Sequence, residues 1–296
     1  MTTDAFSKCH PAVNFLFFLG AIGFGVLIQH PAYLVVAVIT AAVYYLLLNG
    51  RRGWKLVLAM IPLFLFLTAI NPLFNIYGAT PLFSLFGRPY TVEALLYGAA
   101  VAAVFVVMIL WFGCYNKVLT SDKFTSLFGN MIPAISLLLV MIFRMVPNLL
   151  RKARQIAGVR KSVGKGAAEA ATTREKLSDG MTVLDALTSW ALEGSIVTGD
   201  SMRSRGYGAA RRTSFMIYTM TALDWVLLAL MALLAAVVIV FILLGAAAAE
   251  YTPELSVATV SGNTVAGLIA YCLYLLIPTV LHIKEAIQWH ISRSKI

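Results

Sequence analysis

The sequence predicts an all-α polytopic membrane protein, and three observations lead to this fold class. First, 60% of the 296 residues are hydrophobic and only 12% are charged, with a mean hydropathy of +0.85. Second, the apolar residues form separate runs, each about as long as the 20 or so residues that a helix needs to cross a bilayer. Third, the basic residues are distributed as expected for one side of a membrane. A water-soluble fold could not bury so many apolar runs.

Six apolar segments, each bounded by proline, glycine or charge, are the expected transmembrane helices. They cover residues 13–29, 33–48, 54–70, 92–113, 222–245 and 264–281. The first two are separated by His30 and Pro31, which favours a tight helical hairpin. We divide the chain into N-terminal transmembrane helices 1–4 (1–113), a cytoplasmic coupling-helix domain (114–213), and C-terminal transmembrane helices 5–6 with a cytoplasmic tail (214–296).

The basic residues predict the orientation of the chain. With both the N- and C-termini in the cytoplasm, every lysine and arginine except Arg88 lies in a cytoplasmic segment, as the positive-inside rule requires. The last outer connection, 246–263, contains Glu250 and Glu254 but no basic residue. The net charge of +10 is therefore explained by topology and contact with the lipid bilayer rather than by nucleic acid. We expect a multi-pass protein of the cell membrane.

The outer connection at 71–91 is too apolar for an ordinary solvated loop. It is rich in aromatic residues and proline, and Arg88 is its single charged residue. We expect it to dip into the membrane interface or to pack on the neighbouring helices, and contact with another membrane subunit is the alternative.

The cytoplasmic segment predicts amphipathic helices. Residues 132–150 are apolar but interrupted by Arg144 and Pro147, so we expect a helix along the membrane surface rather than a seventh span. The stretch after it places apolar residues such as Ile156 at helical spacing and should end near Gly164.

A second cytoplasmic helix is predicted from about Met181 to the paired glycines Gly206 and Gly208, which are natural helix-stop residues. The small and polar residues 165–180 before it indicate an exposed connection. Apolar residues recur at three and four positions in this helix, so two crossed helices that pack together are expected.

Each predicted cytoplasmic helix carries basic residues near its C-terminus, in Val159-Arg160-Lys161 and in Ser204-Arg205-Gly206. Such an arginine can satisfy the helix-end carbonyls and interact favourably with the negative end of the helix dipole. It can equally present a planar fork of five donors to the carboxylates or carbonyls of a partner. Both interpretations stay open from the residues alone.

No catalytic, metal or cofactor site is predicted. Cys9, Cys114 and Cys272 are scattered singly, and the histidines lack the spacing of a zinc site. Apart from Lys55 and Glu93 in the first two positions of their segments, Asp224 is the only charged residue within the six segments, and we expect it to pair with Arg211 or a neighbouring arginine, Arg212, or to be hydrated at the interface. We therefore expect that the protein is not an enzyme and that energy enters from a partner.

Several short motifs together resemble those of a known family. They are His10-Pro11, Asn71-Pro72 as a turn after the third span, Met145-Val146-Pro147, and above all the run Ser201–Tyr207, which reads SMRSRGY. With the topology and the spacing of 45 positions from Arg160 to Arg205, this pattern is similar to the transmembrane T component of energy-coupling factor transporters, a class of ABC importers for vitamins or transition-metal ions. The resemblance extends over nearly the whole chain.

The resemblance implies a non-catalytic scaffold with two kinds of partner. Two ABC-type ATPase subunits would each bind one cytoplasmic helix, and a membrane-embedded S component would bind and select the substrate. ATP binding would close the ATPases, shift the coupling helices and reorient the S component. The implied docking residues are Val159, Arg160, Lys161, Ser204, Arg205 and Gly206, supported by Arg154, Arg203 and Tyr207.

The first docking motif departs from the family pattern. The family more often has Ala-Arg-Gly where this chain has Val-Arg-Lys. In this alternative, Lys161 or Arg154 would share the docking role with Arg160.

Two other functions compete with this interpretation. A self-sufficient secondary transporter would show inverted repeats, broken helices and midplane charges. A membrane-embedded enzyme would gather histidine, aspartate or serine near one leaflet. Uptake by the chain alone would favour the first, and a product formed by the purified chain would favour the second.

Overall fold

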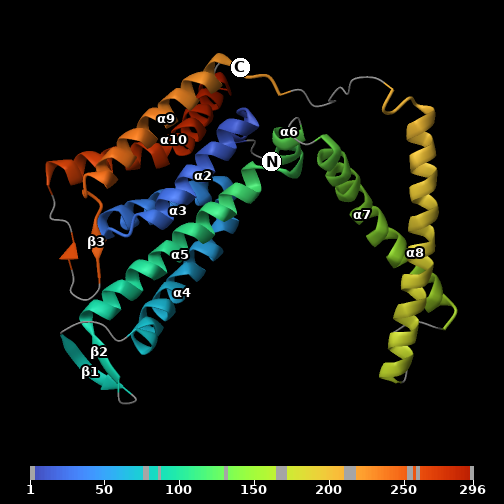
Figure 1. Cartoon of the computed structure of the whole chain (residues 1–296), viewed down its shortest axis with the longest axis horizontal. Coiled ribbons are helices and arrows are strands. Elements are labelled where there is room, and N and C mark those ends of the chain that lie inside the picture. The colour runs from blue at the N-terminus through green and yellow to red at the C-terminus, as the bar shows by residue number, and fades with distance from the viewer. Residues whose placement is uncertain are drawn as a thin grey trace. The chain divides into compact units, whose positions relative to one another are not determined.

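The chain forms two compact units in the computed structural model, which describes residues 4–75, 80–85, 88–129, 133–164, 172–209, 218–251, 256–257 and 261–293. The first unit comprises Met1–Phe124 and Tyr218–Ile296, and the second comprises Thr125–Ile217. Figure 1 shows that the described parts of both units are built almost entirely from helices.

The first unit contains most of the helices. They are α1 (Ala5–Lys8), α2 (Pro11–Leu27), α3 (Pro31–Asn49), the short 3-10 helix η1 (Gly50–Arg52), α4 (Gly53–Phe74), α5 (Val92–Val118), α9 (Ala222–Leu243), α10 (Gly262–Arg293), and the start of α6 (Ser121–Gly129). Two short antiparallel strand pairs join them, β1 (Pro81–Leu85) with β2 (Arg88–Thr91) and β3 (Ala249–Glu250) with β4 (Ser256–Val257).

Among the described residues, four stretches of helix are long and apolar enough to cross a membrane. They are Pro31–Phe74, Val92–Val118, Ala222–Leu243 and Gly262–Trp289, and the apolar helix Pro11–Leu27 is shorter. The first stretch is two helices, because the chain reverses at Gly50, which has a positive φ of 55°, and α4 returns beside α5 (Figure 1). The protein is thus an α-helical membrane protein, with helices over all six predicted segments.

Helices α2 and α3 begin with the same local structure. Each has a proline in its first turn, where the missing N–H costs nothing, and a histidine at the preceding N-cap position. The Nδ1 of His10 accepts a hydrogen bond from the backbone N–H of Ala12 at 3.2 Å, and the Nδ1 of His30 accepts one from Ala32 at 3.3 Å. Both helix starts are therefore determined by a His-Pro pair.

Aromatic side chains form the centre of the first unit. Phe17 of α2 stacks on Tyr274 of α10 with ring centroids 5.4 Å apart, and it meets Trp111 of α5 edge-on at 5.5 Å. The Oη of Tyr274 also donates to the Phe17 carbonyl at 3.2 Å. These contacts join three helices that are far apart in sequence, while α3 packs on both α5 and α10. The outward faces are apolar, as lipid contact requires, and Leu243 is 81% exposed.

Helix α4 does not turn at Asn71-Pro72, so this prediction is wrong. The helix continues through Pro72 to Phe74. A proline has no N–H to donate to the carbonyl four residues earlier, which leaves the Thr68 carbonyl without its usual helical partner. Gly98 of α5 lies against this point, because a Cβ built on it would be 2.9 Å from the Thr68 oxygen and 2.7 Å from the Cβ of Asn71. The helix therefore continues past Pro72 at a point where it packs closely on α5.

The connection after α4 folds back onto the helices, which is one of the arrangements expected for 71–91. Strands β1 and β2 pair as an antiparallel hairpin. The buried Tyr90 donates its hydroxyl hydrogen bond to the Ala69 carbonyl of α4 at 3.1 Å, and Thr80 donates to Glu93 of α5 at 2.8 Å. The hairpin thus covers the ends of α4 and α5.

The first residues that the structure describes, from Asp4 to Lys8, make polar contacts at one end of the first unit. Asp4 is only 3% exposed. Its Oδ2 accepts a hydrogen bond from Tyr44 of α3 at 2.7 Å, and its Oδ1 lies 2.7 Å from the Nδ1 of His282 in α10. Lys8 forms an ion pair with Glu285, also of α10. We call these contacts the N-terminal clasp.

Lys123 of α6 adds a further contact to the N-terminal clasp. Its ammonium donates to the carbonyl of Ser7, to the Ser7 hydroxyl at 3.0 Å and to the Val118 carbonyl at 3.0 Å. Burial lowers the pKa of Lys123 below its usual value. Burial also raises the pKa of the nearby Cys9 thiol to about 11, with the carboxylates of Asp224 and Asp4 acting in the same direction.

Asp224 is buried and serves as a helix cap, so hydration at the interface, one of the two environments predicted for it, is wrong. It forms a reciprocal capping box with Thr221 at the start of α9. Its Oδ1 also accepts a hydrogen bond from the backbone N–H of His10 at 3.0 Å. Arg211 and Arg212, its expected partners, lie outside the described residues. Asp224 therefore joins the start of α9 to the start of α2.

Candidate functional site

The second unit contains the predicted cytoplasmic helices. They are α7 (Pro133–Ser162) and α8 (Thr173–Ser204). Helix α8 begins eight residues before the expected Met181, so the prediction of an exposed connection over 165–180 is wrong for its second half. The cause is a capping box: Thr172 accepts from the Glu175 backbone N–H, and the Glu175 side chain accepts from the Thr172 N–H. This Thr-x-x-Glu pattern is readable in the sequence.

Helices α7 and α8 cross and pack along one half-buried stripe of each (Figure 1). At the end of α7, the Nε of Arg160 forms an ion pair with Asp179 of α8 at 2.5 Å. Two turns earlier in α7, the Lys152 ammonium lies 5.5 Å from the centre of the Trp190 ring, a cation–π contact. These pairs show that the two helices run antiparallel.

The first predicted docking motif lies on the last turns of α7. Val159 is 66% exposed and Lys161 is exposed, whereas the Arg160 side chain is 24% exposed because Asp179 and α8 cover part of it. The helix ends as predicted at Gly164, whose φ is 72° and whose N–H donates to the Lys161 carbonyl at 3.0 Å. The motif is therefore presented on a well-terminated helix end.

The second predicted docking motif ends α8 in a Schellman arrangement. Arg205 is the C-cap residue, and Gly206 follows in the left-handed region with a φ of 73°. The Gly206 N–H donates to the Arg203 carbonyl and the Tyr207 N–H donates to the Met202 carbonyl, each at 3.0 Å. The last carbonyls are thus satisfied by backbone donors. The Arg205 side chain is exposed and makes no ion pair with any described residue.

The remaining predicted site residues are also on the surface. Arg154 and Arg203 are exposed on α7 and α8, and Tyr207 is 45% exposed. The Ser204 hydroxyl donates to the Ser201 carbonyl at 3.0 Å, so it contributes to the helix end. Sequence reasoning missed three residues that position the pair, namely Lys152, Asp179 and Trp190.

The two arginines predicted to dock a partner lie at opposite ends of α8. Arg160 is held by Asp179 in the second turn of the helix, and Arg205 ends it. At 1.5 Å per residue, the 26 residues from Asp179 to Arg205 span about 39 Å. One small partner cannot easily bind both arginines. In the described part of the chain, no three His, Cys, Asp or Glu side chains come together as a metal site would require.

The fold defines the class of this chain as a multi-pass α-helical membrane protein with an additional pair of long helices. Its sequence matches no model of a protein family, and no curated protein is significantly similar to it. The function therefore has to be argued from the residues themselves.

The Arg160–Asp179 pair should contribute modestly to the junction of α7 and α8. Because both side chains are partly exposed, Asp179→Ala or Arg160→Ala should weaken it by about 1 kcal/mol. Amide hydrogen exchange in the last turn of α7 and the first turns of α8 should accelerate about fivefold in either variant. The double variant should add little more, and additive effects of the two substitutions would show that the pair is not coupled.

Proposed function

We propose that this protein is the transmembrane T component of an energy-coupling factor importer. It is a non-catalytic scaffold that couples ATP hydrolysis by two partner ATPase subunits to substrate uptake through a membrane-embedded S component. The substrate class that the resemblance implies is a vitamin or a transition-metal ion. The S component selects the substrate.

The single observation that carries this proposal is the position of the two arginines on one helix pair. Each ends a long helix, and the two are about 39 Å apart along α8. This separation suits two partner subunits, each of which binds one helix end. Since the last carbonyls of α8 already accept hydrogen bonds from the backbone N–H groups of Gly206 and Tyr207, the Arg205 side chain is not needed to satisfy them, and its five donors are available to a partner.

The exposed apolar side chains of the helix pair support contact with a further protein. No residue of α8 is buried, and its outer face carries large apolar side chains away from α7. A stripe of this kind is typical of a protein-interaction surface. It consists of Leu177, Met181, Leu184 and Leu192, with Ile196 beside it.

The contacts within the helix pair suggest how movement is transmitted. An ATPase that binds Arg160 competes with Asp179 for the same guanidinium, so docking loosens or shifts the junction of α7 and α8. A displacement of one helix end is carried along its length because α7 and α8 are continuous for 30 and 32 residues. The apolar face of α8 then passes the movement to the S component.

The proposed orientation places the N- and C-termini in the cytoplasm, with six transmembrane helices. The N-terminal clasp joins Lys8 to Glu285 and Asp4 to His282. Helix α1 and the last third of α10 therefore lie at the same end of the first unit. The basic residues of the η1 turn and of α7 and α8 follow the positive-inside rule in this orientation.

The test is recovery of the ATPases with the solubilised protein. Arg205→Ala should reduce their co-purification at least tenfold, because loss of a charge-assisted contact from a buried interface costs about 2–5 kcal/mol. Arg174→Ala is the matched control, since Arg174 is exposed at the opposite end of α8 and should leave recovery unchanged. Membrane insertion should be the same in both variants.

Two results would contradict the proposed function. Undiminished recovery of the ATPases with unchanged transport in Arg205→Ala would show that this helix end is not a docking site. Substrate uptake by vesicles that contain the chain alone would favour the alternative, a self-sufficient secondary transporter.

A further inference from the structure

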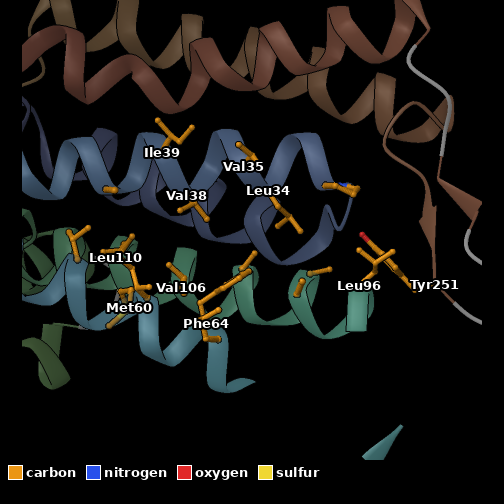
Figure 2. Close-up of a pocket in the computed structure, with 18 residues that line it drawn as sticks. Leu34, Val35, Val38, Ile39, Met60, Phe64, Leu96, Val106, Leu110 and Tyr251 are labelled. Carbon is orange, nitrogen blue, oxygen red and sulfur yellow. The ribbon is translucent and has the colours of Figure 1, made fainter. Parts of the chain in front are cut away.

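A long apolar groove runs between α3 and α4 in the first unit. Both helices pack on α5, but they contact each other far less than either contacts α5, so a space of about 570 Å³ remains between them. Figure 2 shows Leu34 and Val38 of α3 pointing across this space toward Phe64 of α4 and Val106 of α5.

The groove is lined almost entirely by apolar side chains, and small residues make room for it. Ala99, Ala100 and Ala103 of α5 form part of its floor, where larger side chains would fill it. Tyr251 is the one described lining residue with a polar side-chain atom, and its hydroxyl donates to the Gln29 carbonyl at 2.8 Å. The surrounding helices are among those long and apolar enough to cross a membrane. An occupant must therefore present an apolar surface and no buried polar group.

Three basic residues lie at one end of the groove. Val57 of α4 lines it, and Lys55 precedes Val57 by two residues, which places Lys55 about 3 Å further along the helix toward the η1 turn, on a different side of α4 from Val57. Arg51 and Arg52 form the η1 turn immediately before α4, and all three basic side chains are exposed. None of them forms an ion pair with another described residue.

An exposed tryptophan marks the same end of the groove. Trp54 is 56% exposed and lies three and seven residues before Val57 and Ile61, on the helix face that lines the groove. Tryptophan at such a position is typical of the membrane–water interface, where lipid headgroups lie. Lys117 of α5, on the same side, is engaged with the Leu48 carbonyl and with the Asn49 side chain at 3.0 Å. The charges free to bind a ligand are therefore those of the η1 turn and Lys55.

We propose that this groove binds an anionic phospholipid, with one acyl chain between α3 and α4 and the phosphate at Arg51, Arg52 and Lys55. The apolar groove matches the acyl chain, and the three cations match the charge of the headgroup. The lipid would fill the space between two helices that otherwise meet mainly near their turn. This inference does not depend on the ATPase-coupling function.

Native mass spectrometry of the full-length, delipidated protein tests the proposal with two lipids of identical acyl chains. Dioleoyl phosphatidylglycerol should bind as one retained molecule, at least tenfold more tightly than dioleoyl phosphatidylcholine. Replacing the three cations together (Arg51→Gln, Arg52→Gln, Lys55→Gln) should weaken phosphatidylglycerol binding on the order of 100-fold, since each basic residue near a lipid surface contributes about fivefold. The matched control is Arg151→Gln, Arg174→Gln, Lys176→Gln, which removes the same charge from exposed sites on α7 and α8.

A second pair of variants tests the groove itself. Ala42→Leu with Ala99→Leu adds side-chain volume inside the groove and should abolish retention of both lipids. Ala59→Leu makes the same change on the exposed face of α4 and should leave binding intact. Thermal unfolding and gel filtration identify a variant that fails to fold, and the cation and lipid comparisons do not depend on the groove variants.

Any one of four results would overturn the proposal. Equal binding of the two lipids would show that the headgroup is not recognised. Unchanged phosphatidylglycerol binding in the variant that lacks the three cations would show that these residues do not bind the phosphate. Full lipid retention in the folded Ala42→Leu, Ala99→Leu variant would show that the acyl chain does not lie in the groove. A wild-type chain that retains no lipid but binds a partner membrane protein through the groove would identify a protein helix as the occupant.

Discussion

Gly98→Leu is expected to destabilise the first unit by about 3 kcal/mol or more, because overpacking a tight helix contact forces the backbones apart. Even a Cβ at this position would approach the Thr68 carbonyl oxygen to 2.9 Å and the Asn71 Cβ to 2.7 Å. The first of these atoms is backbone, so no side-chain rotation can relieve the contact. The measurement is the thermal unfolding of the purified protein in detergent, followed by tryptophan fluorescence.

Gly23→Leu is the matched control for this substitution. Gly23 is also in the middle of an apolar helix, but a Cβ built on it has no described atom within 4 Å. Leucine has a better helix propensity than glycine by about 0.8 kcal/mol, so this variant should be as stable as the wild type or slightly more so. Equal stability of the two leucine variants would show that α4 and α5 do not approach each other as closely as the structure has them.

Asp4→Ala is expected to open the N-terminal clasp. The substitution leaves the buried Tyr44 hydroxyl and the His282 ring without the carboxylate that both contact at 2.7 Å. Breaking a buried pair by removing one partner costs about 3–5 kcal/mol. The segment of α1 should detach from α3 and α10, which would expose Cys9.

Cysteine alkylation measures this opening directly. In the wild type, Cys9 should react slowly with a maleimide near neutral pH, because it is partly buried and its pKa is raised to about 11. In Asp4→Ala, with Cys114→Ala and Cys272→Ala to leave a single thiol, the rate should rise at least tenfold. Asp122→Ala, an exposed acidic residue of α6, should leave it unchanged. A slow reaction in Asp4→Ala would mean that Asp4 does not hold the segment.

Local signals in the chain predict the helices and several of their ends. The apolar runs predicted all six helical segments of the first unit, and glycine predicted where α7 and α8 end, at Gly164 and Gly206. Both glycines have positive φ values, which other residues adopt only with strain. Such features depend on a few neighbouring residues, so they can be predicted from a sequence pattern.

Errors in the predictions arose where a local rule was misapplied or outweighed by packing. Proline suggested a turn at Pro72, but α5 packs Gly98 against the freed carbonyl and the helix continues. Helix α8 starts earlier than its apolar pattern predicts, because the capping box of Thr172 and Glu175 begins it. The candidate docking arginines could be found from their motifs, whereas Asp179, the partner of Arg160, fell in a stretch expected to be a loop.

Hydropathy, the placement of charge and the positions of glycine were sufficient to establish a helical membrane protein with a pair of long helices that end in arginine. The contacts that close the first unit come only from the folded chain: Asp4 meets His282 across 278 residues of sequence, and the lipid-sized groove exists because α3 and α4 separate along α5. The physical reason is that hydrophobic burial and helix-end chemistry act over a few residues, whereas ion pairs and cavities depend on which helix faces meet in space.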